Sequence, residues 1–310
     1  MVRRVTIALL ALVALVAASC GDDPADESGV GTGAGSEDTA DPADDGDGST
    51  DGPGEPVLLV DLVGAFTTVE TSFQGVPMIA VYEDGTVIQP GAQILIYPGP
   101  ALPAVMRSQV DAATVDAIVE AARAAGLDQP DLDYGQPPIA DAGDTVVTVT
   151  IDGETYEHRA TALGVDALPE PGLEGDAVDP PLDAAGDLTP EQQENRAALR
   201  DLISEVNGLV GEGTVEEAEP FDADRYRLLV RPASEMGVEP DMDPAPPVEW
   251  TVEGVELSRA DCLPVEGDAV QDLVALLTDA DALTRFTSGG EEWAVVARPV
   301  LPHEATCPDA

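Results

Sequence analysis

Two Asp-Gly dipeptides, each set between two short segments of strand length, restrict the fold of this chain more than any other feature of its sequence. The first is Asp84-Gly85, between residues 76–82 and 86–89, and the second is Asp152-Gly153, between residues 145–151 and 154–160. Asp-Gly is a preferred loop of two-residue hairpins, because it accepts the positive φ angles that such a turn requires. The sequence therefore predicts two antiparallel hairpins in its first half.

Further strands are expected wherever a short apolar run ends at Gly or Pro. They are residues 57–63, 93–97 and 225–231, a strand pair within 248–257 turned at Glu253-Gly254, and a closing hairpin from 284 to 298 turned at Gly289-Gly290. Trp250 and Trp293 fall on these strands and are expected in the core. Residues 232–247 are predicted to be an irregular loop.

Three segments repeat apolar residues at helical spacing, namely residues 111–126, the run that opens at Thr189-Pro190, and residues 268–277. Thr189 suits the cap of the second helix, Pro190 its first position, and Gln192 the reciprocal cap. The buried stripes are expected at Val115, Ile118, Val119 and Ala122, at Leu199, Leu202, Ile203, Val206 and Leu209, and at Val270, Leu273, Val274 and Leu277.

Frequent hairpins with few helices favour an α+β fold, in which an antiparallel sheet built of hairpins carries about three amphipathic helices. Residues 56–163 are expected to form a first α+β half and residues 189–310 a second. Residues 164–188 are rich in Pro, Gly, Asp and Ala without periodicity, and they are expected to be a loop or linker between the halves.

The first nineteen residues have the zones of a secretory signal peptide, with Arg3 and Arg4 before an apolar run from 5 to 16. That run holds twelve residues, whereas a helix that crosses the hydrocarbon layer needs about twenty. The segment Ala17-Ala18-Ser19-Cys20 resembles the lipobox of bacterial lipoproteins, which implies that Cys20 is diacylated and becomes the N-terminus. The alternative is ordinary signal cleavage that leaves Cys20 as a free thiol.

Residues 20–55 are predicted to be an acidic, disordered tether that precedes the fold. From Gly21 to Glu55 there are twelve acidic residues, no basic residue and no aromatic one. Such a segment buries too little apolar surface to offset the entropy lost on ordering. Repulsion among its carboxylates extends the chain, so the folded part is expected to stand off from the membrane.

The charge of the chain excludes several classes of function. Its 61 acidic residues outnumber its 13 basic ones, for a formal net charge of −48, and every basic residue is Arg. So negative a surface repels phosphate backbones, and no nucleic-acid partner is expected. The absence of Lys removes phosphate-loop enzymes, Schiff-base enzymes and Ser-x-x-Lys acyl enzymes.

Two cysteines remain once Cys20 is set apart, namely Cys262 and Cys307. An even pair in an exported protein is expected to form a disulfide, because the compartment outside the cytoplasm permits oxidation. The alternative is two separate thiols, since spacing in the sequence does not establish proximity.

No catalytic or metal-binding residue is assigned from the sequence, and no cofactor is expected. His158 and His303 lie outside any zinc motif, and His158 is expected on the surface of a hairpin strand. Short acidic pairs offer oxygen ligands for calcium, although solvated loop charge is the preferred interpretation. These pairs are Asp131 and Asp133, Asp241 and Asp243, and Asp279 and Asp281.

One loop stands out as a contact surface, the rigid and partly apolar segment that holds Tyr97, Pro98, Pro100 and Leu102. The alternative is a structural turn that covers the core. The runs from Val81 to Ile88, Ile96 to Pro103, Leu229 to Pro232 and Ala297 to Pro302 resemble a group of uncharacterised exported lipoproteins from high-GC Gram-positive bacteria. That resemblance implies export and lipidation, and it carries no activity.

The expected function is therefore that of a lipoprotein on the extracytoplasmic face of the cell membrane. Its expected partners are the membrane itself, through the N-terminal lipid, and a cell-envelope protein or glycan. The folded part is expected to be a non-catalytic binding or interaction module. The alternative is a surface hydrolase that uses carboxylates, with or without calcium assistance.

Overall fold

The computed structural model describes residues 54–64, 66–94, 96–164, 188–235 and 245–307. These residues form an α+β fold in which four α-helices accompany twelve strands in two largely antiparallel sheets, so the expected fold class is confirmed. The expected signal peptide, Cys20, nearly all of the tether and nearly all of the 164–188 segment lie outside the described residues.

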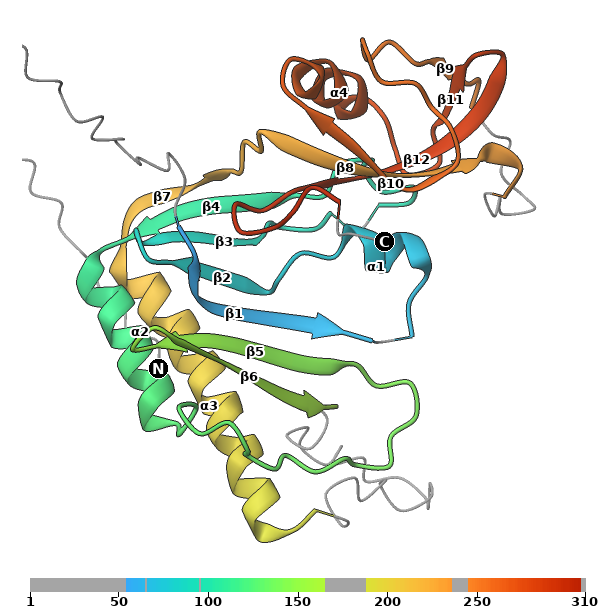
Figure 1. The fold of residues 1–310 in the computed structure, drawn as a ribbon. Helices are drawn as coiled ribbons and strands as arrows, with labels where there is room; N and C mark the ends of the chain where they lie inside the picture. Colours follow the sequence, from blue (N-terminus) through green and yellow to red (C-terminus); the bar gives the residue numbers. More distant parts are fainter. Residues whose placement is uncertain (1–53, 65, 95, 165–187, 236–244, 308–310) are drawn as a thin grey trace, which may run out of the picture. The chain divides into compact units, whose positions relative to one another are not determined.

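The first sheet has seven strands in the order β6-β5-β1-β2-β3-β4-β7, and all neighbours are antiparallel (Figure 1). Its strands and associated helices are β1 Pro56–Val63, α1 Val69–Gln74, β2 Ile79–Tyr82, β3 Thr86–Pro90, β4 Val105–Val110, α2 Ala112–Ala124, β5 Asp144–Ile151, β6 Glu154–Thr161, α3 Pro190–Gly213 and β7 Thr214–Pro220.

Both Asp-Gly hairpins are confirmed, and their turns need the backbone freedom that the sequence supplies. Asp152 and Gly153 join β5 to β6 with φ angles of 54° and 79°. Gly85 joins β2 to β3 at φ 85°, and a Cβ atom there would lie 2.3 Å from the carbonyl oxygen of Val110. Only glycine therefore fits at position 85, because any side chain would collide with backbone.

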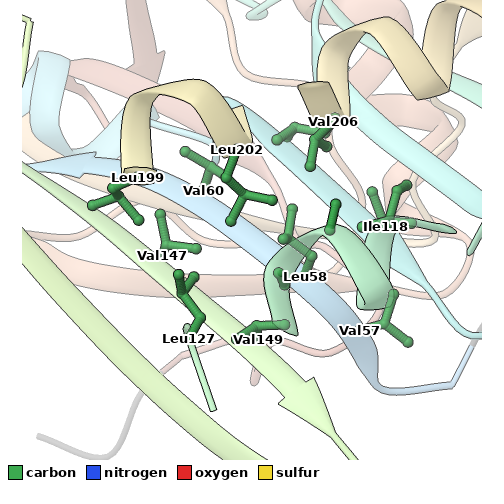
Figure 2. Close-up of a cluster of buried hydrophobic side chains, with 14 of the residues drawn as sticks. Val57, Leu58, Val60, Ile118, Leu127, Val147, Val149, Leu199, Leu202 and Val206 are labelled. Carbon is green, nitrogen blue, oxygen red and sulfur yellow. The ribbon is translucent and has the colours of Figure 1, made fainter. Parts of the chain in front are cut away.

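The main core lies between the first sheet and helices α2 and α3, which cover one face of it. Figure 2 shows Leu199, Leu202 and Val206 of α3 and Ile118 of α2 above side chains of β1 and β5. The stripes expected on both helices are confirmed, since their residues are buried or packed against this cluster. The capping box of Thr189 and Gln192 at the start of α3 is also present.

The second sheet has the order β10-β8-β12-β11-β9 and pairs antiparallel except between β9 and β11. Its elements are β8 Arg225–Pro232, a 3-10 helix Ala233–Glu235, β9 Val248–Glu249, β10 Ala260–Glu266, α4 Ala269–Thr278, β11 Arg285–Ser288 and β12 Glu291–Pro299. Helix α4 buries Val270, Leu273 and Leu277 in a second core with Phe286 and Trp293, as its apolar spacing predicts.

Two expected strands are wrong. The described residues of 93–97 make no strand, because they belong to the connection between β3 and β4, which pair directly with each other. Residues 248–257 hold only the short β9, followed by a turn in which Trp250 Nε1 donates to the carbonyl oxygen of Val255 at 2.8 Å. Trp250 is thus half-buried against the second core without being on a strand.

The tail after β12 joins the two sheets. Leu301 is fully buried on the face of the first sheet that α2 and α3 leave open, in a third cluster with Tyr82, Ile88 and Val105. Cys307 forms a disulfide with Cys262 of β10, with 5.8 Å between the Cα atoms, so the expected pairing is confirmed. The tail is therefore attached to both sheets, through Leu301 to the first and through the disulfide to the second.

Removal of the disulfide should lower the stability of the fold. For a sequence separation of 45 residues, loop closure in the unfolded chain predicts that the Cys262→Ala/Cys307→Ala variant loses about 4 kcal/mol of unfolding free energy. Urea unfolding of the oxidised wild type and the double variant measures this loss. Dithiothreitol should destabilise the wild type and leave the variant unchanged; equal midpoints for all samples would contradict the prediction.

Candidate functional site

Two connections leave the same end of the first sheet. Because β1 is antiparallel to β2, and β3 to β4, the end of β1 lies beside the start of β2 and the end of β3 beside the start of β4. The connection from β1 to β2 includes α1, and the connection from β3 to β4 runs from Gly91 to Ala104 (Figure 1). Residues about 30 positions apart in the sequence thus share one end of the fold.

The two connections at this end carry almost no charge. Residues 85–106 contain no charged residue, and residues 62–82 contain only Glu70, in a chain that is 24% charged overall. The sequence around them is acidic, with Asp61 before the first segment and Glu83 and Asp84 between the two. Neighbouring elements nevertheless bring carboxylates to the same end. Val63 of β1 pairs with Asp144, Arg107 of β4 pairs with Glu219, and Phe66 N donates to the carbonyl oxygen of Asp141. In a protein of formal charge −48, these two connections therefore form a surface of low charge density that is bordered by carboxylates.

The same end exposes most of the large apolar side chains that remain in contact with water. We call these seven residues the neutral end: Leu62, Phe66, Val69, Met78, Ile94, Ile96 and Tyr97. Their exposed fractions run from 48% for Met78 to 87% for Phe66. Among the described residues only Val215 and Val248 are comparable large apolar side chains elsewhere. Exposed apolar groups concentrated in this way are a feature of interaction sites.

The four residues that the sequence analysis proposed as a contact surface differ in their exposure to solvent. Tyr97 and Pro100 are exposed, whereas Pro98 and Leu102 are half-buried, and Leu102 packs against the second core. Backbone bonds hold the loop in place, since Ala101 donates to the carbonyl oxygen of Ala280 at 3.1 Å and Ala282 donates to that of Gly99 at 2.8 Å. The loop is thus both a structural turn and the support on which Tyr97 is presented.

Ile94, Ile96 and Phe66 are surface residues that the sequence did not identify. The first two fall in the segment expected to be a strand, where alternate residues would be buried, yet they are 59% and 60% exposed. The missed signal was the uninterrupted run without charge from Gly85 to Met106. Phe66 carries no such signal by itself, because only the pairing of β1 with β2 brings it to this end.

A pocket of about 500 Å³ lies on the open face of the first sheet, beside the tail. It is lined by Thr86, Ile88, Arg107, Glu219, Pro220, Phe221, Asp222, Asp224, Arg225, Val300 and Pro302. Arg225 is committed to structure, since it donates to the carbonyl oxygens of Leu301 and Glu304. Within the described residues, none of the three carboxylates is hydrogen-bonded to a histidine or a hydroxyl group, so no acid–base pair is assembled.

A buried polar group fastens the tail to the first sheet. Arg298, 2% exposed, binds Glu304 with two hydrogen bonds of 2.5 and 2.7 Å and donates through Nε to the carbonyl oxygen of Gly75 at 2.6 Å. The Tyr82 hydroxyl lies 2.8 Å from His303 Nδ1. These groups satisfy one another's hydrogen-bonding capacity, so the arrangement holds residues 298–304 in place.

Burial sets the direction of the pKa shifts in this group. It raises the pKa of Tyr82, with a further contribution from the charge of Glu304, and it lowers the pKa of His303. Burial by itself would raise the pKa of Glu304, but the hydrogen bonds and charge of Arg298 outweigh it and the net shift is downward. Glu304 thus remains a carboxylate beside the Arg298 guanidinium.

His158 is not the surface residue that its strand position suggested. It is 2% exposed, its Nδ1 lies 3.0 Å from the Tyr134 hydroxyl, and its Nε2 donates to the carbonyl oxygen of Leu127 at 3.0 Å. Burial raises the pKa of Tyr134 to about 12. His158 on β6, whose side chain points toward the helices, therefore links the 126–134 loop to the sheet.

One carboxylate of each described acidic pair has structural partners. Asp133 accepts from Gly135 N and Gln192 Nε2, which together lower its pKa. Asp281 accepts from Leu283 N and Thr284 Oγ1. Asp241 and Asp243 lie outside the described residues. Within the described ranges, no group of three His, Cys, Asp or Glu side chains is placed to hold a metal ion.

Comparisons with protein-family models, curated proteins and solved structures find no match to this chain. Of the helices that the structure describes, none combines the length and apolar character needed to span a bilayer.

The lowered pKa of His303 predicts a pH-dependent contribution to stability. Its pKa in the folded state lies below the ordinary 6.5, so below pH 6.5 the unfolded chain binds a proton that the folded chain resists. The contribution of His303 to the free energy of unfolding should therefore become less favourable as the pH falls from 7.5 to 5. In urea unfolding, the His303→Gln variant should gain stability relative to the wild type over that interval; a constant difference would contradict this.

Proposed function

We propose that this chain is a membrane-anchored extracytoplasmic lipoprotein whose folded part is a non-catalytic binding module. The observation that carries the binding role is the neutral end, where seven large apolar side chains are exposed on two segments of low charge in an acidic protein. The membrane anchor rests on the sequence around Cys20. The module is held at the outer face of the membrane through the lipid on that residue.

The chemistry of the neutral end favours a protein partner over a glycan. The centres of protein interfaces are depleted of charge and enriched in aromatic residues and Met, and the neutral end includes Phe66, Tyr97 and Met78. A glycan requires hydrogen-bonding groups beside its aromatic platforms. Exposed polar side chains such as Thr71 and Gln93 are present on these segments, but the large exposed side chains are aliphatic or aromatic. Of the cell-envelope partners expected, an uncharged apolar protein surface fits best.

A surface hydrolase is the alternative function, and the pocket beside Arg107 is the place for it. It brings Glu219, Asp222 and Asp224 to one concave site. The binding role has more support for two reasons. These three carboxylates are exposed, and the buried polar side chains that hold the tail are already hydrogen-bonded to one another.

The anchor has a direct test. Mass spectrometry of the native protein, purified from membranes, should give an N-terminal peptide that begins at Cys20 and carries acyl chains, because lipidation precedes removal of residues 1–19. The Cys20→Ala variant should lose the acyl mass and leave the membrane fraction. A native protein that begins at Met1, or that begins at residue 20 without lipid, would contradict the anchor.

The binding role is tested by cross-linking in intact cells. The photo-reactive residue p-benzoylphenylalanine, in place of Tyr97, should give discrete cross-linked products after illumination, because that side chain faces the partner. The matched control places the same residue at Val215, which is 60% exposed on β7 at the opposite end of the sheet. Equal products from both positions, or none from position 97, would remove the support for a binding surface.

A further inference from the structure

We infer that the partner seated on the neutral end is a second copy of this chain, so that the protein forms a dimer with this end at its interface. This inference rests on the binding role proposed above and names the partner that contacts the neutral end. Four arguments carry it: the charge that two copies bring together, the apolar area available, the absence of groups suited to lipid, and the place where the chain enters the fold.

The charge of the chain restricts how two copies can approach each other. Each carries a formal net charge of −48, and like charges placed against each other across an interface cost several kcal/mol. The neutral end is formed by two segments that hold only Glu70 between them. These segments bring only Glu70 of each copy to the contact. Asp141 and Asp144 lie beside them, and Asp144 is paired with Arg159 at 3.0 Å. A basic partner would gain little from segments of such low charge, whereas a second acidic copy requires them.

The apolar area is sufficient for a stable dimer. Fully exposed side chains of this size present on the order of 200 Å² each. At exposed fractions of 48–87%, the seven residues of the neutral end present on the order of 900 Å² in all. A standard stable interface buries about 800 Å² on each partner. In a two-fold homodimer the same patch of both copies must be self-complementary, and apolar side chains meet that requirement because they do not repel one another.

A lipid surface is the less favoured occupant. Segments that lie in a membrane interface combine apolar residues with Lys or Arg that contact anionic headgroups. Residues 62–82 and 85–106 contain neither Lys nor Arg, and the acidic Asp61, Glu83 and Asp84 adjoin them. These carboxylates would be repelled by anionic lipid, although they leave the apolar side chains free to meet protein.

The chain enters β1 at the end of the strand away from the neutral end. Residues 20–53, which connect the proposed anchor to the fold, lead into β1 at Pro56, whereas the neutral end lies where β1 finishes. Eight residues of strand separate these two points by roughly 25 Å. The attachment point therefore does not obstruct the neutral end, and two copies anchored in one membrane have a raised effective concentration for each other.

The test uses the full-length lipoprotein in isolated membranes, with a single added cysteine at Ile94, Ile96 or Tyr97 and copper phenanthroline as oxidant. At least one of these three positions should give a disulfide-linked dimer on a non-reducing gel, because a two-fold interface brings equivalent residues together. The matched control is Val215→Cys, on an equally exposed apolar side chain at the other end of the sheet. It should stay monomeric, and adding Phe66→Asp to the reactive cysteine variant should reduce dimer formation at least tenfold.

Three results would overturn this inference. The first is no dimer at positions 94, 96 and 97, and the second is an equal yield at position 215. In the third, the three cysteines are protected from a water-soluble maleimide without forming dimers, which assigns the neutral end to lipid. If cross-linking from position 97 yields a different protein while the cysteines form no dimer, the proposal of a second copy is wrong, although the binding role stands. If neither experiment gives a product, both fail.

Discussion

The antiparallel pairing of β1 with β2 and β5 is the constraint on which the rest of this fold depends. It turns the alternating side chains of β1 and β5 toward α2 and α3, so that Leu58, Val147 and Val149 are fully buried. The same pairing decides which connections share an end of the sheet. The neutral end exists because β1 and β3 finish where β2 and β4 begin.

The open face of the first sheet is closed by a different mechanism. No helix covers β2 and β3 there; the tail does, through Leu301 and the bond between Tyr82 and His303. A single aliphatic side chain supplies little burial, so the tail also needs the Arg298–Glu304 pair and the disulfide to stay in place. Breaking one partner of such a buried pair costs far more than the pair contributes, which makes this junction sensitive to charge.

Electrostatics shapes the surface in two opposite ways. Net negative charge keeps copies of the protein apart and opposes polyanionic partners. Against that background, a segment without charge is itself a signal, because a negatively charged partner can approach it at lower electrostatic cost. The rigid backbone bonds from Gly99 and Ala101 to residues 280–282 hold this segment to the second sheet and limit the entropy that Tyr97 would lose on binding.

Local chemistry alone determined much of this protein. Turns at Asp84-Gly85 and Asp152-Gly153, the cap at Thr189 and the stripes of three helices follow from the conformational needs of those residues. The pairing of Cys262 with Cys307 followed from their number. Of the candidate site, the sequence identified the loop of Tyr97 but not Ile94, Ile96 or Phe66. Strands β4, β7 and β10 were missed because polar residues interrupt their apolar pattern. Only the tertiary structure decided that the 93–97 segment belongs to the connection between β3 and β4, that His158 is buried and that residues from two connections meet, since each depends on which strands become neighbours.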